Sequence, residues 1–108
     1  MELLNKSSLS LQRQFLIETL QRINFGRLEN LRFKAGEPIL DETSKIFREH
    51  KFGSENGPRP ESTKIDFALK KQLAELFRYF DDRRDGIVES LEVKHGLPFR
   101  MVVIETAT

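Results

Sequence analysis

The sequence predicts an α+β fold, a two-layer sandwich in which a four-stranded antiparallel sheet carries two helices on one face. The first observation behind this prediction is an internal repeat, and the second is a change in each copy from helical to strand periodicity. The third is a tight turn at the same place in both copies. We therefore expect a tandem αββ repeat in the order α-β-β-α-β-β.

The repeat becomes visible when GRLENLRFKAGEPI (residues 26–39) is aligned without gaps with GIVESLEVKHGLPF (residues 86–99). Six of the fourteen positions are identical, and half of the other eight exchange similar residues. A match of this density is rare by chance in a chain of 108 residues, which is long enough to bury its own core. The expected parts are a single domain 1–108, the repeat units 8–47 and 62–105, and an irregular loop 48–61.

A segment with helical periodicity precedes each copy of the repeat. The first segment has Ser8 or Ser10 as a candidate N-cap, and its apolar stripe consists of Phe15, Leu16, Leu20 and Ile23. The second segment follows Ser62 as a candidate cap, and its stripe consists of Leu69, Leu73, Leu76, Phe77 and Phe80. We expect both helices to be amphipathic and to bury one face each.

Strand periodicity follows each helical segment. Apolar and polar residues alternate around residues 31–33 and 91–93, as in strands with one buried face. The turns KAGEP and KHGLP predict a type I turn closed by a left-handed glycine, rather than a two-residue turn that gives Ala35 or His95 a positive φ. The last strand, FRMVVIE, is apolar on both sides at residues 101–104, which predicts a central strand or a covered edge.

Two glutamates occupy equivalent places in the first strand of each copy. Leu28 and Val88 are out of phase with the strands that they precede, and a β-bulge near Glu29 and Glu89 explains the shift. In that interpretation both glutamates are solvated. The alternative is that Glu29 and Glu89 point into the covered face as a symmetric pair whose role is uncertain.

One stretch, FRYFDDRRDGIVESLEVKHG (residues 77–96), resembles half of a calcium-binding EF-hand. The resemblance implies three carboxylate ligands: Asp81, Asp85 and Glu92. Arg83 stands where that family supplies a further oxygen ligand, and the equivalent stretch of the first copy has no acidic loop. We therefore prefer a hairpin with no metal and no cofactor, and keep a degenerate calcium site at residues 81–92 as an alternative.

The composition limits the classes of function. Hydrophobic residues make up 38% and charged residues 32% of the chain, which has no cysteine and therefore no disulfide, thiolate metal site or cysteine nucleophile. No run approaches the about 18 apolar residues that cross a bilayer, so we expect a cytoplasmic protein without membrane contact. The formal net charge of +1 does not indicate a general nucleic-acid binder.

The loop REHKFGSENGPRPES, which joins the two copies, is the most unusual segment. Its candidate partner-binding residues are Arg48, Lys51, Phe52, Asn56 and Arg59. No phosphate-binding glycine loop, nucleophile elbow or paired-carboxylate signature is present, so we expect no enzyme. The leading hypothesis is a binding or assembly module that takes a protein partner or forms a homodimer. The alternative is nucleic-acid binding through the open sheet face or the loop from Arg48 to Arg59.

Overall fold

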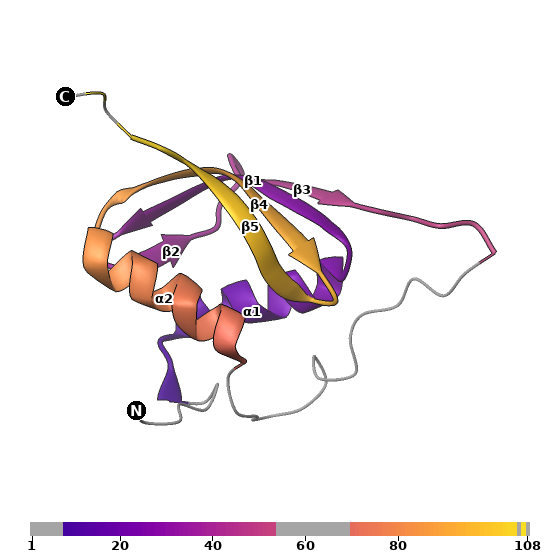
Figure 1. The fold of residues 1–108 in the computed structure, drawn as a ribbon, viewed down its shortest axis with the longest axis horizontal. Coiled ribbons are helices and arrows are strands. Elements are labelled where there is room, and N and C mark those ends of the chain that lie inside the picture. Colours follow the sequence, from indigo (N-terminus) through magenta and orange to yellow (C-terminus); the bar gives the residue numbers. More distant parts are fainter. Residues whose placement is uncertain (1–7, 54–69, 106, 108) are drawn as a thin grey trace.

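The computed structural model describes residues 8–53, 70–105 and 107 of the chain. It shows a small α+β fold with two helices and an antiparallel sheet of five strands (Figure 1). The elements in chain order are α1 (Leu11–Ile23), β1 (Gly26–Lys34), β2 (Glu37–Ile39), β3 (Lys45–Arg48), α2 (Lys71–Arg83), β4 (Gly86–Lys94) and β5 (Leu97–Ile104). In the described part of the chain, no helix has the length and apolar character needed to cross a membrane.

The sheet is built around β1 and β4, which pair antiparallel from Gly26 opposite Val93 to Phe33 opposite Gly86. The strand order is β2-β1-β4-β5, and β3 also pairs with β1. β2 and β3 thus share one edge of the sheet at opposite ends of β1, while β5 forms the other edge. In Figure 1 the sheet arches over both helices.

The core lies between the helices and the inner face of the sheet. Its buried apolar side chains come from both helices and both central strands: Leu16, Ile17, Leu20, Ile23, Leu28, Leu31, Phe33, Leu73, Leu76, Phe77, Phe80, Val88, Leu91 and Val93. Full burial of a side chain of this size stabilises the fold by roughly 1.5–3 kcal/mol relative to exposure. Burial of this common core is the main contribution to the stability of the sheet against the helices.

Most of the predicted helical residues are confirmed. The hydroxyl of Ser10, the N-cap of α1, accepts a hydrogen bond from the Arg13 backbone N–H at 3.2 Å. Phe15 was expected in the core, but that expectation is wrong: the side chain is 52% exposed, and Ile17 is buried instead. Of the residues expected before α2, Ser62 and Leu69 lie outside the described residues.

The expected number of four strands is wrong because the first return strand is interrupted between β2 and β3. The Asp41 carboxylate accepts hydrogen bonds from the hydroxyl and backbone N–H of Thr43, at 2.6 and 2.8 Å, and so closes a local turn. These bonds, together with Arg32 at 2.7 Å, lower the pKa of Asp41 from 3.8 to about 2. Asn30 also donates its side-chain N–H to the Thr43 carbonyl oxygen at 3.0 Å, which holds the turn against β1.

The prediction of a type I turn after each first strand is also wrong. Both turns have two residues with positive φ: 53° and 80° at Ala35 and Gly36, and 56° and 73° at His95 and Gly96. Two positive φ values define the type I′ turn, whose twist matches the twist of a hairpin. Each glycine N–H also donates to the carbonyl oxygen of a residue at a helix end, at 2.8 and 3.0 Å. This tertiary contact fixes the position of the turn.

Both helices end in the same uncommon conformation. Asn24, after α1, has φ 62° and ψ −62°, and Arg84, after α2, has φ 69° and ψ −55°. In each case the following residue donates its backbone N–H to the carbonyl of the preceding one, at 2.7 and 2.8 Å. These are γ-turns of the strained kind, and they redirect the chain from helix to strand without a loop.

Candidate functional site

The outer edge of β5 is the candidate site. β5 has eight residues and pairs only with β4 among the described residues, so alternate backbone N–H and C=O groups face outward. The opposite edge is protected in several ways: β2 has three residues and contains Pro38, and β3 has four and begins with Lys45. Short strands, proline and lysine are devices that prevent strand addition. β5 has a proline only near its start.

Apolar side chains accompany the exposed backbone of β5. Phe99, Val102 and Ile104 are 56%, 54% and 53% exposed. Met101 and Val103 pack against the core, so by alternation Val102 and Ile104 project from the face opposite the helices. The prediction of a central position for this doubly apolar strand is wrong, because β5 is the last strand of the sheet. A covered edge requires an additional chain segment.

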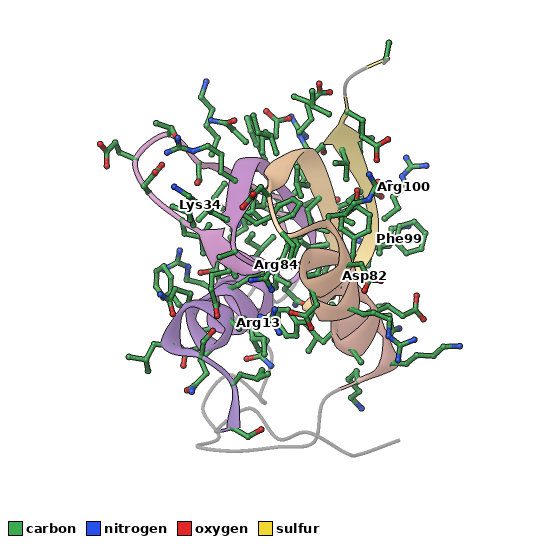
Figure 2. All side chains as sticks on the ribbon, turned by 90° about the vertical axis from the view of Figure 1, so that its left-hand side faces the viewer. Arg13, Lys34, Asp82, Arg84, Phe99 and Arg100 are labelled. Atoms are coloured by element: carbon green, nitrogen blue, oxygen red, sulfur yellow. The ribbon has the colours of Figure 1, made fainter. Side chains whose placement is uncertain are left out.

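A groove runs between α2 and β5 on the inner side of this edge. Its volume is about 260 Å³, and its lining includes Leu76, Tyr79, Phe99 and Met101. Phe99 lies where the β4–β5 register shifts, and in Figure 2 it projects from β5 to the outside together with Arg100. The groove is therefore open toward the edge at which a further strand would pair.

The charged side chains beside the edge have partners within the chain. Arg100 donates from Nε to the Glu92 carboxylate at 2.8 Å. The Lys94 ammonium lies 4.0 Å from the centre of the Phe99 ring. Glu105 forms an ion pair with Arg83 at 2.8 Å across the end of α2. No strong field of one sign therefore opposes the approach of another strand.

The structure describes three of the five predicted partner-binding residues of the loop, and their role stays a prediction. Arg48 ends β3, and the Lys51 ammonium lies 3.6 Å from the Glu49 carboxylate. Phe52 is 94% exposed and meets the ring of His50 edge to face at 5.2 Å. The other two predicted residues, Asn56 and Arg59, lie outside the described residues.

The two equivalent glutamates lie beside irregularities in the central strands. Asn30 has φ 57°, and the β4–β5 register shifts next to Glu89. These are the bulges expected from the phase of the sequence. Glu89 is exposed, and Glu29 accepts from Arg27 Nε at 2.7 Å. Neither is among the buried residues of the core, so the alternative of an inward-facing pair does not describe this structure.

The structure uses the three residues implied by the EF-hand resemblance separately. Asp81 pairs with an arginine of α1, Asp85 accepts the Ala35 backbone N–H at 2.8 Å, and Glu92 lies within β4 rather than before an exit helix. Within residues 8–53 and 70–105, no three His, Asp or Glu side chains gather in a group that could hold a metal ion.

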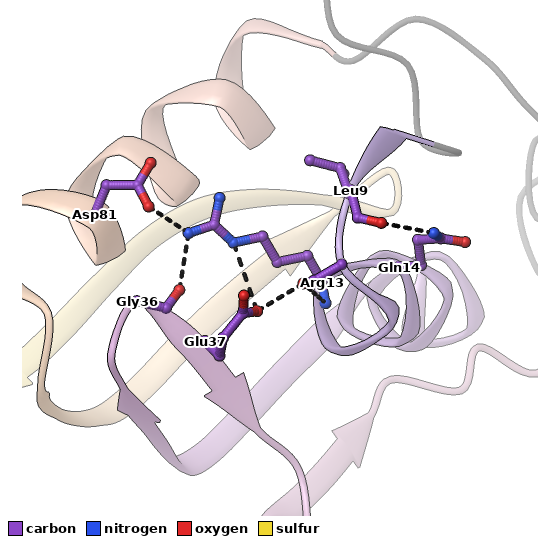
Figure 3. Close-up of polar contacts among 7 residues, drawn as sticks. Leu9, Arg13, Gln14, Gly36, Glu37 and Asp81 are labelled. Carbon is purple, nitrogen blue, oxygen red and sulfur yellow. Dashed lines mark hydrogen bonds and ion pairs between the residues drawn. The ribbon is translucent and has the colours of Figure 1, made fainter.

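Arg13 joins three elements, and sequence reasoning missed it. Its side chain is 13% exposed, and its Nη2 donates to the Gly36 carbonyl at 2.8 Å and to Asp81 at 2.5 Å (Figure 3). The guanidinium also lies 5.0 Å from the centre of the Phe77 ring. Glu37 stands 3.9 Å from Arg13 Nε. An arginine between two glutamines of a helix gives no sequence signal for this role, which is structural.

Comparison of the chain with protein-family models, curated proteins and solved structures found no match. An α+β fold serves many unrelated functions, so the fold class by itself assigns none. Function therefore has to be inferred from the exposed groups of this chain, and the β5 edge is the most distinctive of them.

Proposed function

We propose that this protein is a non-enzymatic protein-binding module that accepts an extended strand of a partner at the β5 edge. The observation that carries this proposal is the difference between the two edges of one sheet. The β2–β3 edge is broken by the Asp41 turn and contains Pro38, whereas β5 is one strand of eight residues whose proline and register shift lie near its start. An unprotected apolar edge is a hazard unless a partner covers it.

We also propose that the fold is a two-layer tandem αββ repeat. The helices span residues 11–23 and 71–83 and the central strands span 26–34 and 86–94, so each pair is offset by sixty positions. The turn glycine of each hairpin donates to the helix end of the other half, from Gly36 to Arg84 and from Gly96 to Asn24. This reciprocity supports a pseudo-twofold arrangement. In it, β2–β3 and β5 are equivalent edges, of which one is blocked.

In strand addition, the unpaired backbone and the exposed apolar side chains of β5 would have different roles. Backbone hydrogen bonds along the edge supply affinity, and alternate side chains of the ligand supply specificity. A ligand strand would place one row of side chains beside Val102 and Ile104, and the other row toward the groove of Phe99 and Met101. The expected ligand is thus an extended peptide with apolar residues on both faces.

The charge pattern favours protein over nucleic acid as the partner. Three arginines of the open sheet face have carboxylates at 2.7–2.8 Å: Arg27 with Glu29, Arg32 with Asp41, and Arg100 with Glu92. Phosphate binding needs cations that exchange small counterions for phosphate, and these pairs would have to be broken first. The Arg27 guanidinium also lies over the Phe47 ring, 4.0 Å from its centre, and covers a ring face on which a base could stack.

The test is a selection of peptides from a random displayed library on the immobilised protein, followed by affinity measurements on two matched variants. Val102→Lys introduces a charge in the middle of the β5 edge, and Ile39→Lys introduces the same charge on the opposite edge. We expect selected peptides to lose at least about tenfold in affinity, roughly 1.4 kcal/mol, with Val102→Lys only. Peptides that bind both variants equally would contradict the proposal.

A further inference from the structure

The partner that best fits the β5 edge is a second copy of this chain. Resting on the proposed strand-binding role, we infer that two β5 strands pair antiparallel around a twofold axis at Val102 and so join two sheets into one. An isologous contact of this kind requires one surface that is complementary to itself. The sequence of β5 between Pro98 and Glu105 meets that requirement in one register.

The side chains of β5 exclude the registers near its start. An axis at Arg100 would place the two Arg100 side chains directly opposite each other, and like charges in that position are destabilising. An axis at Met101 would leave the two arginines as diagonal neighbours, roughly 7–8 Å apart and within reach of long side chains. It would also place Pro98, which has no N–H, inside the ladder opposite Ile104.

An axis at Val102 removes both conflicts. Val102 then faces its own copy, and Arg100 faces Ile104 on the side of the sheet away from the helices. On the helix side, Met101 faces Val103. The two Met101–Val103 pairs and the central pair are apolar, and each Arg100 keeps its own Glu92 at 2.8 Å. Opposite residues share a face in this register, so the helices of both copies lie on one side of the joined sheet.

The ends of this register bring opposite charges together. Glu105 of one copy, which pairs with Arg83 of its own chain at 2.8 Å, faces Phe99 of the other, and the Lys94 ammonium already lies 4.0 Å from the centre of that ring. By symmetry the same pairing occurs at both ends of the paired strands. An axis at Val103 would instead set the glutamate opposite Met101. Charge complementarity therefore favours the axis at Val102 from this side also.

The joined strands would cover the exposed apolar groups of β5. Phe99, Val102 and Ile104, each more than half exposed in one chain, all lie on or beside the contact. A single pair of strands is smaller than the about 1,200–2,000 Å² that typical stable interfaces bury. We therefore expect a dimer that dissociates on dilution, rather than an obligate one.

Single cysteines test the register directly because the chain has none of its own. In full-length protein under mild oxidation, Val102→Cys should form a disulfide-linked dimer, since side chains directly opposite across antiparallel strands have Cβ atoms about 4.5–5.5 Å apart. Arg100→Cys and Met101→Cys report the neighbouring registers. Ile39→Cys, on the protected edge, is the matched control. Sedimentation of the unmodified protein and of Ile104→Lys measures the dimer without a cross-link.

The expected result is a mass that rises toward the dimer over about two decades of concentration, a loss of this rise with Ile104→Lys, and cross-linking fastest at Val102. A protein that stays monomeric over that range, or links as fast through Ile39→Cys, overturns the inference. If it is monomeric but library peptides still require β5, only the identity of the partner is wrong. If the peptides are also insensitive to Val102→Lys, the proposed function fails with it.

Discussion

Replacing Arg13 with alanine should destabilise the protein strongly. Its guanidinium joins α1 to the β1–β2 turn at Gly36 and to α2 at Asp81, with 13% of the side chain exposed. A hydrogen bond to a charged group contributes about 1.5–3 kcal/mol, an ion pair with an exposed partner up to about 1, and a cation–π contact such as that with Phe77 roughly 0.5–1. Because these terms are not additive, we expect a loss of about 3 kcal/mol in the free energy of unfolding.

The assay is guanidinium denaturation followed by circular dichroism, with the midpoint and slope compared between variants. Arg22→Ala, on the exposed side of the last turn of α1, is the matched control and should cost less than about 1 kcal/mol. Arg13→Met retains much of the aliphatic stem and separates packing from hydrogen bonding. If Arg13→Ala costs no more than Arg22→Ala, the guanidinium does not join the helices and the reasoning is refuted.

Three further changes test other parts of the fold. Asp41 has a pKa lowered to about 2, so its ionised carboxylate stabilises the folded state above about pH 4 and stabilises it less as the pH falls toward 2. Asp41→Asn should flatten the pH dependence of the free energy of unfolding in this range, and an unchanged pH dependence would contradict the assigned hydrogen bonds. Gly26→Ala would bring a Cβ to 2.0 Å from the Phe47 carbonyl oxygen, so it should lower the free energy of unfolding by about 1–3 kcal/mol and speed hydrogen exchange in β3. Unchanged exchange in β3 would argue against this close approach. Ala35→Asn should stabilise the φ 53° turn by up to about 1 kcal/mol in thermal unfolding, and a loss of stability would contradict the type I′ assignment.

Periodicity and capping predicted the existence and the type of the main elements. The α+β class, the Ser10 cap and the buried stripe from Leu73 to Phe80 all depend on local chemistry and spacing. These features follow from the burial of one face of each element, which the sequence displays directly. The bulge near Glu89 was predictable for the same reason, because it appears as a shift of phase.

The features that sequence reasoning missed depend on contacts between distant residues. The type I′ turn at Ala35 and Gly36 accompanies a hydrogen bond from the Gly36 N–H to the Arg84 carbonyl oxygen at the end of α2. Arg84 is the counterpart, sixty positions later in the chain, of Asn24 at the end of α1. The interruption after β2 depends on Asn30 as well as on the local Asp41 turn. Neither partner is adjacent in the chain, and the periodicity of a single helix or strand does not show either contact.

The position of β5 shows why the candidate site was only partly predictable. A doubly apolar strand predicted a covered position, and the structure places the strand at an edge. The same pattern therefore has two physical explanations, burial within one chain or burial by a partner. Only the strand order, which sequence periodicity does not determine, distinguishes them. The loop residues Arg48, Lys51 and Phe52 attracted attention by composition; Lys51 lies beside Glu49 and Phe52 beside His50, and their role in partner binding stays a prediction.

The most direct measurement of the central claim is hydrogen exchange of the β5 backbone amides by NMR, with and without an occupant of the edge. The occupant is either the protein itself at about a hundredfold higher concentration or a peptide selected from the library. The account predicts slower exchange for the β5 amides that point away from β4, with β2 and β3 unchanged. Equal exchange of the β5 amides under all conditions, or protection at β3 instead, would contradict it.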